Sequence, residues 1–261
     1  PAHIWTPWFS LFGSRSGFDS ITECYLDQLK NIHAIETGLS SDPPMNWRLS
    51  QLDKFSIVSF SDLHSFWPWR IGREATQFGC EMDYSALIQS IRKQKIVSTI
   101  EVDPNYGKYH LDGHRNCGVV LTPEEAKKHG DVCPKCGKPL TIGVLHRVEE
   151  LADRPVGYEP NNRPGFKTLL PLSEVIATVG GFGIATKKSW EYYNKLVSGT
   201  SEMHVLLEMP EKELLARTHP KIAAAVLKNR SGEIVVRGGY DGVYGEADLE
   251  PISKQKSLGE Y

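Results

Sequence analysis

The stretch His114-Arg-Asn-Cys117, followed after fifteen residues by Cys133-Pro-Lys-Cys136-Gly137, decides how the middle of this chain folds. Two residues between ligands form a tight turn that points both side chains at one ion, and Gly137 tolerates the positive φ of such a turn. Four nitrogen and sulfur ligands complete a tetrahedral shell and leave no position for a substrate. We therefore predict a structural zinc site and look for the chemistry elsewhere in the chain.

Length and composition narrow the class of protein. A chain of 261 residues with 40% hydrophobic residues can build one large domain or two ordinary ones. Its formal charge of -2 gives no overall basic surface, so contact with nucleic acid requires a local basic patch. The cysteines outside the zinc set, Cys24 and Cys80, are isolated, which is typical of a reducing compartment. With no secretory leader and no long apolar run, we expect a cytoplasmic protein with no membrane partner.

The pattern of the first hundred residues predicts strands that alternate with helices. Ser20 and Glu23 have the spacing of a capping box, and the helix that follows carries apolar side chains on one face. Short apolar runs at 32–37 and 55–60 predict buried strands, and 96–102 predicts a third. Asp83 is placed to cap a helix before that third strand. This alternation favours α/β packing with a parallel sheet.

The second half of the sequence reads as mainly helical. Residues 154–171 contain four prolines and two glycines and predict an ordered loop. Helices are expected over 172–227, one of which has Pro220 in its first turn and Gly232 past its end. Two short apolar runs flank Gly-Gly-Tyr-Asp-Gly at 238–242 and predict a β-hairpin.

A second group of candidate functional residues follows the strand expected at 55–60. Alternation on a strand would point Asp62 and His64 to the same side, at the strand end where α/β folds place their active sites. A carboxylate and an imidazole in that position can bind one metal ion or bridge two. His3 lies on another expected strand near the start. The alternative is that Asp62 caps a helix beside a hydrogen-bonded histidine.

Aromatic and basic side chains interleave directly after this group. The segment contains Trp67, Trp69, Arg70 and Arg73, a combination suited to stacking on bases and binding phosphates. Ordinary core packing is the competing explanation for the tryptophans. The segment is therefore a candidate surface for nucleic acid.

Taken together, several stretches of the sequence resemble the endonuclease Q family. They are Pro-Ala-His-Ile-Trp-Thr-Pro-Trp at 1–8, Glu-Thr-Gly-Leu-Ser-Ser at 36–41, Ser-Asp-Leu-His-Ser at 61–65, Pro-Trp-Arg-Ile-Gly-Arg at 68–73, the zinc motif and the hairpin Gly-Tyr-Asp-Gly-Val-Tyr at 239–244. The resemblance implies a PHP-type metal-dependent phosphoesterase domain, a zinc-binding module and a helical C-terminal region. In this chain they correspond to 1–104, a zinc-ribbon-like module at 105–150, and 151–261.

The resemblance also implies roles for particular residues. PHP domains carry their metal ligands on strand ends of a distorted (β/α)7 barrel, and His3, Asp62 and His64 match its later ligands in type, order and spacing. Asp62 is then the catalytic carboxylate that bridges the metals and orients the attacking hydroxide, and Glu36 has a possible supporting role. The implied cofactors are structural zinc and catalytic divalent Zn, Mn or Mg.

The chain departs from the family pattern in two places. PHP enzymes begin with His-x-His and further His and Glu ligands that do not occur before His3, and the chain opens at Pro1 without an initiator methionine. We therefore expect only the C-terminal part of the barrel here, and an N-terminally incomplete chain that is inactive alone. Archaeal relatives look like Cys-x-x-Cys where this chain has His114, which still allows a tetrahedral site, and His110 is a competing ligand.

The implied activity is a metal-dependent DNA-repair endonuclease that nicks DNA beside uracil, hypoxanthine or an abasic site. One alternative is a PHP phosphatase that acts on a small phosphomonoester. Another is a zinc-bearing nucleic-acid-binding module without catalysis. The sequence leaves open the preferred lesion, the identity of the catalytic metals and whether the chain forms homo-oligomers.

Overall fold

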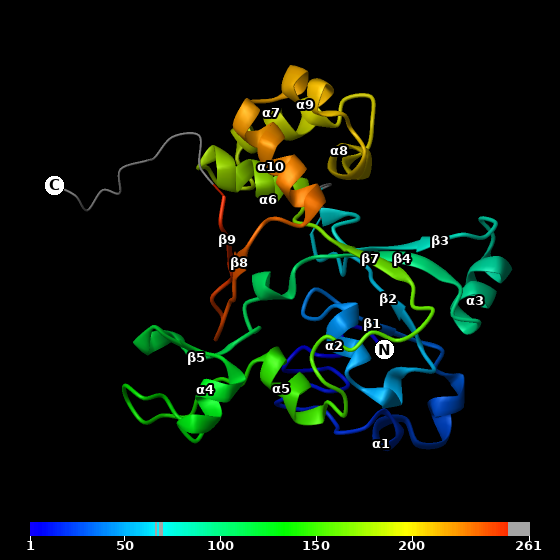
Figure 1. The fold of residues 1–261 in the computed structure, drawn as a ribbon, viewed down its shortest axis with the longest axis vertical. Coiled ribbons are helices and arrows are strands. Elements are labelled where there is room, and N and C mark those ends of the chain that lie inside the picture. Colours follow the sequence, from blue (N-terminus) through cyan, green and yellow to red (C-terminus); the bar gives the residue numbers. More distant parts are fainter. Residues whose placement is uncertain (66, 68–69, 250–261) are drawn as a thin grey trace. The chain divides into compact units, whose positions relative to one another are not determined.

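The computed structural model describes residues 1–65, 67 and 70–249 and divides the chain into two compact units (Figure 1). The first unit comprises 1–62, 74–168 and 236–246, and the second comprises 63–73, 169–235 and the residues from 247 onward. The chain therefore passes from the first unit to the second and back. The predicted boundaries at 104 and 150 stay predictions.

The first unit begins with a compact N-terminal segment. Helix α1 (Ile21–Tyr25) starts at Ser20, whose hydroxyl accepts a hydrogen bond from the N–H of Glu23, as its sequence predicts. The helix continues as the 3-10 turn η1 (Leu26–Asn31). Its apolar face packs on a core of buried side chains that includes Ile4, Trp5, Leu11, Phe12, Ile21, Ile35, Leu49, Leu52, Phe55, Val144 and Val148.

Two small sheets form the α/β part of this unit. Strand β1 (Ala34–Glu36) pairs in parallel with β2 (Ser56–Val58), and α2 (Pro43–Trp47) and η2 (Ser50–Leu52) lie between them in sequence. In the second sheet β4 (Ile96–Glu101) lies between β3 (Ala75–Phe78), which is antiparallel to it, and β7 (Gly165–Thr168), which is parallel. Helix α3 (Tyr84–Arg92) starts at Asp83 and connects β3 to β4.

The structure confirms a mixed α/β fold but changes three details. The strand expected around His3 is wrong, because the described residues there form turns and bends before α1. The loop predicted over 154–171 is wrong at Gly165–Thr168, because these residues find hydrogen-bond partners on β4, more than sixty positions earlier in the chain. Strand β3 is also absent from the prediction. The PHP barrel itself stays a prediction.

The region of the zinc motif belongs to the first unit. It contains η4 (Pro104–Tyr106), β5 (Asp112–His114), η5 (Arg115–Cys117), β6 (Val119–Leu121), α4 (Pro123–Lys128) and α5 (Val144–Leu151). Its own core consists of Val119, Ala126, Cys133 and Leu140. The predicted hairpin forms with its strands shifted by a few residues, as β8 (Val236–Arg237) and β9 (Glu246–Ala247).

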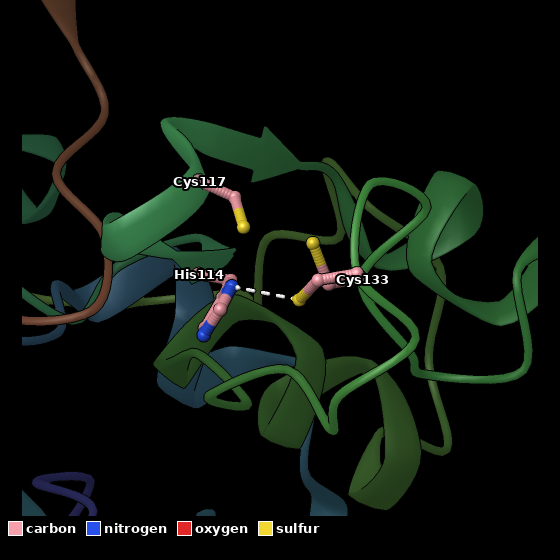
Figure 2. A group of neighbouring side chains, drawn as sticks. His114, Cys117 and Cys133 are labelled. Carbon is pink, nitrogen blue, oxygen red and sulfur yellow. Dashed lines mark hydrogen bonds between the residues drawn. The ribbon is translucent and has the colours of Figure 1, made fainter.

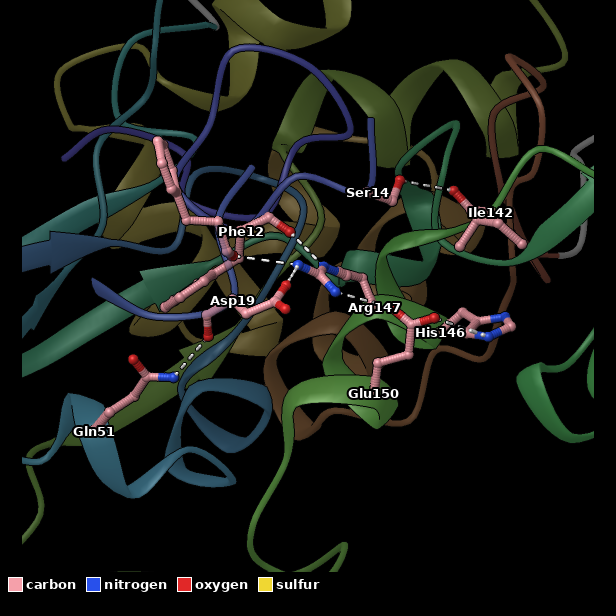
Figure 3. A network of polar contacts seen from close by, with 9 residues as sticks. Phe12, Ser14, Asp19, Gln51, Ile142, His146, Arg147 and Glu150 are labelled. Atoms are coloured by element: carbon pink, nitrogen blue, oxygen red, sulfur yellow. Dashed lines mark hydrogen bonds and ion pairs between the residues drawn. The ribbon is translucent and has the colours of Figure 1, made fainter. Parts of the chain in front are cut away.

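Arg147 of α5 connects this region to the N-terminal segment (Figure 3). Its guanidinium donates to the backbone oxygens of Phe12 and Phe18 and to the Asp19 carboxylate, at 3.0, 3.2 and 2.6 Å. The same group pairs with Glu150 one turn along the helix at 3.1 Å. Five donors on one rigid fork suit this arrangement, in which two backbone oxygens and two carboxylates converge.

The second unit is helical. Its helices are α6 (Leu172–Gly180), α7 (Lys187–Leu196), α8 (Glu202–Leu207), α9 (Glu211–Arg217) and α10 (Pro220–Ser231). As predicted, α10 has Pro220 at its first position and ends at Gly232, whose φ of 74° suits glycine. The helices enclose fully buried side chains such as Leu172, Ile176, Leu196, Val205, Leu206, Met209, Leu214 and Val226. Among the helices described, none has the length and apolar character needed to cross a bilayer.

Candidate functional site

The four residues of the zinc motif come together as predicted. One ligand atom from each of His114, Cys117, Cys133 and Cys136 lies within 4.8 Å of the other three. Figure 2 shows the first three side chains turned toward one common centre. His114 Nδ1 lies 3.4 Å from Cys136 Sγ, close to the edge of roughly 3.6 Å that a tetrahedron with zinc bond lengths of about 2.1 and 2.3 Å requires. The donor set and spacing fit zinc.

The two ligand turns have the same construction. Gly118 directly follows Cys117 with a φ of 58°, and Gly137 directly follows Cys136 with a φ of 69°. In each turn the glycine N–H donates back to a carbonyl near the start of the turn. Left-handed backbone costs glycine little, so both turns can direct their ligands inward without strain.

The Cys133 thiol is prepared for metal binding. Although its burial alone would raise the pKa, backbone N–H groups of Lys135 and Cys136 and hydrogen bonds from Cys136 and His114 lower it to about 6. Donors aimed at sulfur favour the thiolate, which is the form that binds zinc. His110, the competing ligand considered above, does not belong to this cluster.

A buried ion pair fastens the zinc region to α5. Asp112 is fully buried and accepts hydrogen bonds from His146 Nδ1 and the N–H of Gly143, both at 2.6 Å. The hydrogen bond that His146 donates to the Asp112 carboxylate raises the pKa of His146 despite the burial of the imidazole. The pair therefore holds the first ligand strand and the start of α5 in fixed register.

His3 and Asp62 line a second candidate site in the same unit. They border one pocket of about 480 Å³, which lies in the range of about 300–1,000 Å³ typical of ligand pockets. Strand β2 ends at Val58, so strand alternation does not place Asp62, contrary to the prediction. Its φ of 41° instead turns the chain at this point.

Glu36 and Gly38 hold His3 in position. The Glu36 carboxylate is 8% exposed and accepts a hydrogen bond from the His3 N–H at 2.7 Å, while Thr6 Oγ1 lies 3.2 Å from His3 Nδ1. A Cβ on Gly38 would lie 2.4 Å from the His3 Cα, so only glycine fits there. The supporting role anticipated for Glu36 has this geometric basis.

Backbone strain concentrates at the same pocket. Nine non-glycine residues of the described chain have positive φ, and four of them, His3, Phe9, Leu39 and Asp62, line this pocket. Such residues cost on the order of 1–3 kcal/mol each and tend to occur where geometry serves binding.

The sequence did not predict the other side chains of this pocket as substrate contacts. Trp8 packs edge-on against Tyr109 at 5.3 Å, and the ammonium of Lys108 lies over the rings of Tyr109 and Tyr244 at 5.6 and 5.8 Å. His110 also lines the pocket, and its burial lowers the pKa to about 4. The run Lys-Tyr-His at 108–110, basic and aromatic beside a zinc motif, is the signal that could have indicated them.

The remaining predicted residues belong to the segment 63–73 of the second unit. His64 is exposed, and Arg70 and Arg73 are partly exposed. Trp67 is 36% exposed and lies edge-on to Trp190 of α7 at 6.5 Å. Trp69 falls outside the described residues.

Comparison with known proteins gives consistent matches. A family model described as the MJ0043 C-terminal domain matches residues 171–233. The chain is 36% identical to the uncharacterized protein MJ0043 of Methanocaldococcus jannaschii over 258 residues, and 34% identical to the uncharacterized protein YqxK of Bacillus subtilis over 251 residues. These alignments cover 95% and 94% of this chain but only 32% and 59% of the relatives.

Two solved structures match nearly the whole chain. The lesion-specific endonuclease PfuEndoQ from Pyrococcus furiosus superimposes with a TM-score of 0.84 at 33% identity, over 95% of this chain and 62% of its own. An Endonuclease Q complex with a 27-mer duplex that carries an abasic lesion at the active site gives 0.84 at 32% identity, over 99% and 65%. The chain thus spans less than two thirds of each of these proteins.

Proposed function

The chain belongs to the endonuclease Q family, and we propose that it forms part of a metal-dependent DNA-repair endonuclease that nicks DNA beside deaminated bases or abasic sites. The observation that carries the proposal is the match to two endonuclease Q structures, one of them in complex with a duplex that carries an abasic lesion, over at least 95% of this chain. At 32–33% identity the likeness to these structures extends beyond the fold alone.

In this proposal His3, Asp62 and His64 hold divalent metals, and the pocket that His3 and Asp62 line admits the lesion. When bound, the metals would supply a water of lowered pKa and stabilise the leaving oxygen. The carboxylate of Asp62 would orient the attacking water, and Glu36 would keep His3 in place through its backbone.

The pocket walls suit an extruded nucleotide. Trp8 and Tyr109 offer aromatic surface for a base, and Lys108 supplies positive charge for the neighbouring phosphate. A damaged base pairs weakly, so its extrusion costs only a few kcal/mol, which selects in favour of lesions. The segment with Trp67, Arg70 and Arg73, and Trp69 in the same segment, would contact the DNA strand.

The test compares this chain with a form extended to the length of the endonuclease Q structures. Both are assayed for nicking of duplexes that contain uracil, hypoxanthine or an abasic site. We expect nicking by the extended form, and a loss on the order of a hundredfold or more in its Asp62→Ala variant. Asp27→Ala removes an exposed carboxylate whose one partner within the described residues is its neighbour Gln28, and it should retain full activity.

Several outcomes would contradict the proposal. Equal activity of Asp62→Ala and the parent would remove Asp62 from the chemistry. A hundredfold preference for a small phosphomonoester would favour the phosphatase alternative. Tight binding of lesion duplexes with no cleavage by the extended form, and a single zinc per chain, would favour the non-catalytic alternative.

A further inference from the structure

His110 has a role in neither the zinc site nor the metal chemistry proposed above, yet it lines the pocket of His3 and Asp62. Its side chain is 6% exposed, and its Nδ1 is sealed from solvent without a hydrogen-bond partner in the described part of the chain. A buried polar atom without a partner is costly and calls for an explanation.

The two ring nitrogens differ in their surroundings. Nε2 makes no hydrogen bond within the described residues, but unlike Nδ1 it is not among the sealed atoms. The ring is neutral near pH 7, because burial lowers its pKa to about 4. Buried N–H donors are rarely left without an acceptor, so the proton is better placed on Nε2 than on Nδ1. Nε2 is then a donor available to a ligand in the pocket.

We propose that His110 determines lesion specificity by donating a hydrogen bond from Nε2 to the carbonyl oxygen that deamination creates on a base. This inference rests on the proposed function. Uracil and hypoxanthine carry a carbonyl oxygen where cytosine and adenine carry an amino group. A fixed N–H donor forms a hydrogen bond with the oxygen but not with an amino group, which is itself a donor. A single neutral imidazole can therefore favour both deaminated bases.

The other side chains of the pocket are compatible with this role of His110. Trp8 and Tyr109 present ring surfaces that tolerate either base, because stacking does not distinguish pyrimidine from purine. His110 follows Tyr109 directly, and its backbone is fixed by hydrogen bonds to Gly107 and from Leu145, at 3.2 and 3.0 Å. We therefore assign discrimination between deaminated and undamaged bases to His110, and affinity for any extruded base to the aromatic side chains.

The test measures equilibrium binding of this 261-residue chain to fluorescent duplexes that differ at one position. The position carries uracil, hypoxanthine, an abasic site or the undamaged base. His110→Phe keeps a ring of similar size without nitrogen, and His110→Gln keeps an N–H donor near the place of Nε2. Zinc content and thermal unfolding establish that each variant is folded.

We expect His110→Phe to weaken binding of the uracil and hypoxanthine duplexes roughly fivefold to tenfold, the worth of one net hydrogen bond. Binding of the abasic duplex should stay within about twofold, because it has no base for the imidazole to contact. His110→Gln should recover part of the preference.

Other results would overturn the inference. Equal weakening on all four duplexes would assign His110 a structural role, and loss of a metal from His110→Phe would make it a ligand. An unchanged preference in His110→Phe would contradict the inference alone, whereas a wild-type chain without any lesion preference would contradict the proposed function as well.

Discussion

Replacing Glu101 by glutamine should stabilise the protein increasingly as the pH rises. Glu101 ends β4 with no exposed surface, and one carboxylate oxygen accepts a hydrogen bond from Thr37 at 2.8 Å. The other oxygen has no partner among the described residues. An amide can therefore replace the carboxyl group and keep the hydrogen bond from Thr37, since its nitrogen takes the place of the oxygen that accepts nothing.

The sign and size of the effect follow from the pKa. Burial raises the pKa of Glu101 from 4.5 to about 7, so the folded state holds this proton more tightly than the unfolded state. The corresponding stability is fully present below pH 4.5 and is lost as the pH rises through 7. A difference of about 2.5 in pKa corresponds to roughly 3 kcal/mol, so the advantage of Glu101→Gln should grow from under about 1 kcal/mol at pH 5 to about 3 kcal/mol at pH 8.

Urea unfolding followed by tryptophan fluorescence at pH 5, 6, 7 and 8 measures this difference. Glu81→Gln is the matched control, because it makes the same chemical change on an exposed residue before α3 and should show no comparable trend. A constant difference between Glu101→Gln and wild type across the pH range would refute the reasoning. It would mean that Glu101 titrates in the folded protein as it does in the unfolded chain.

Three further predictions concern the zinc region. Cys133→Ser should lose bound zinc and expose the small core of that region to protease, while Cys80→Ser, at an exposed free cysteine, should leave zinc content unchanged. Asp112→Ala should lower the free energy of unfolding by about 3–5 kcal/mol, because it leaves the buried Nδ1 of His146 and the backbone N–H of Gly143 without a partner. Urea unfolding measures this loss, and a much smaller value would contradict the account. Gly137→Val should cost about 1–2 kcal/mol through its positive φ and weaken zinc affinity in a chelator competition more than Gly137→Asn does; equal effects would contradict this account.

Local signals in the sequence predicted the parts of the fold that depend on neighbouring residues. Asp83 starts α3, and Gly232 ends α10, because a cap needs only the next few residues. The zinc motif was predictable for a similar reason, since each pair of ligands is set by a turn of four residues. The two turns must also come together in space, and the small core around Ala126 accounts for this.

Long-range pairing was not predictable in the same way. Strand β7 is only four residues long in a proline-rich segment, and it becomes a strand because β4 offers it hydrogen-bond partners. From the sequence, His110 was interpreted as a competing zinc ligand. Its burial in the pocket wall arises from tertiary packing, which the sequence does not show. Glu101 gave no sign in the sequence that it would be buried, because an acid after an apolar run is usually exposed.

The contrast between the two sites in the first unit supports different roles for them. Where the zinc turns need left-handed backbone they use Gly118 and Gly137, which adopt it at little cost. The pocket uses His3 and Asp62 in left-handed backbone, at a cost on the order of 1–3 kcal/mol each. Glycine in either place would relieve the strain but remove the imidazole or the carboxylate. The pocket thus keeps polar side chains where the zinc turns use glycine, which is the pattern expected of a site that binds a ligand.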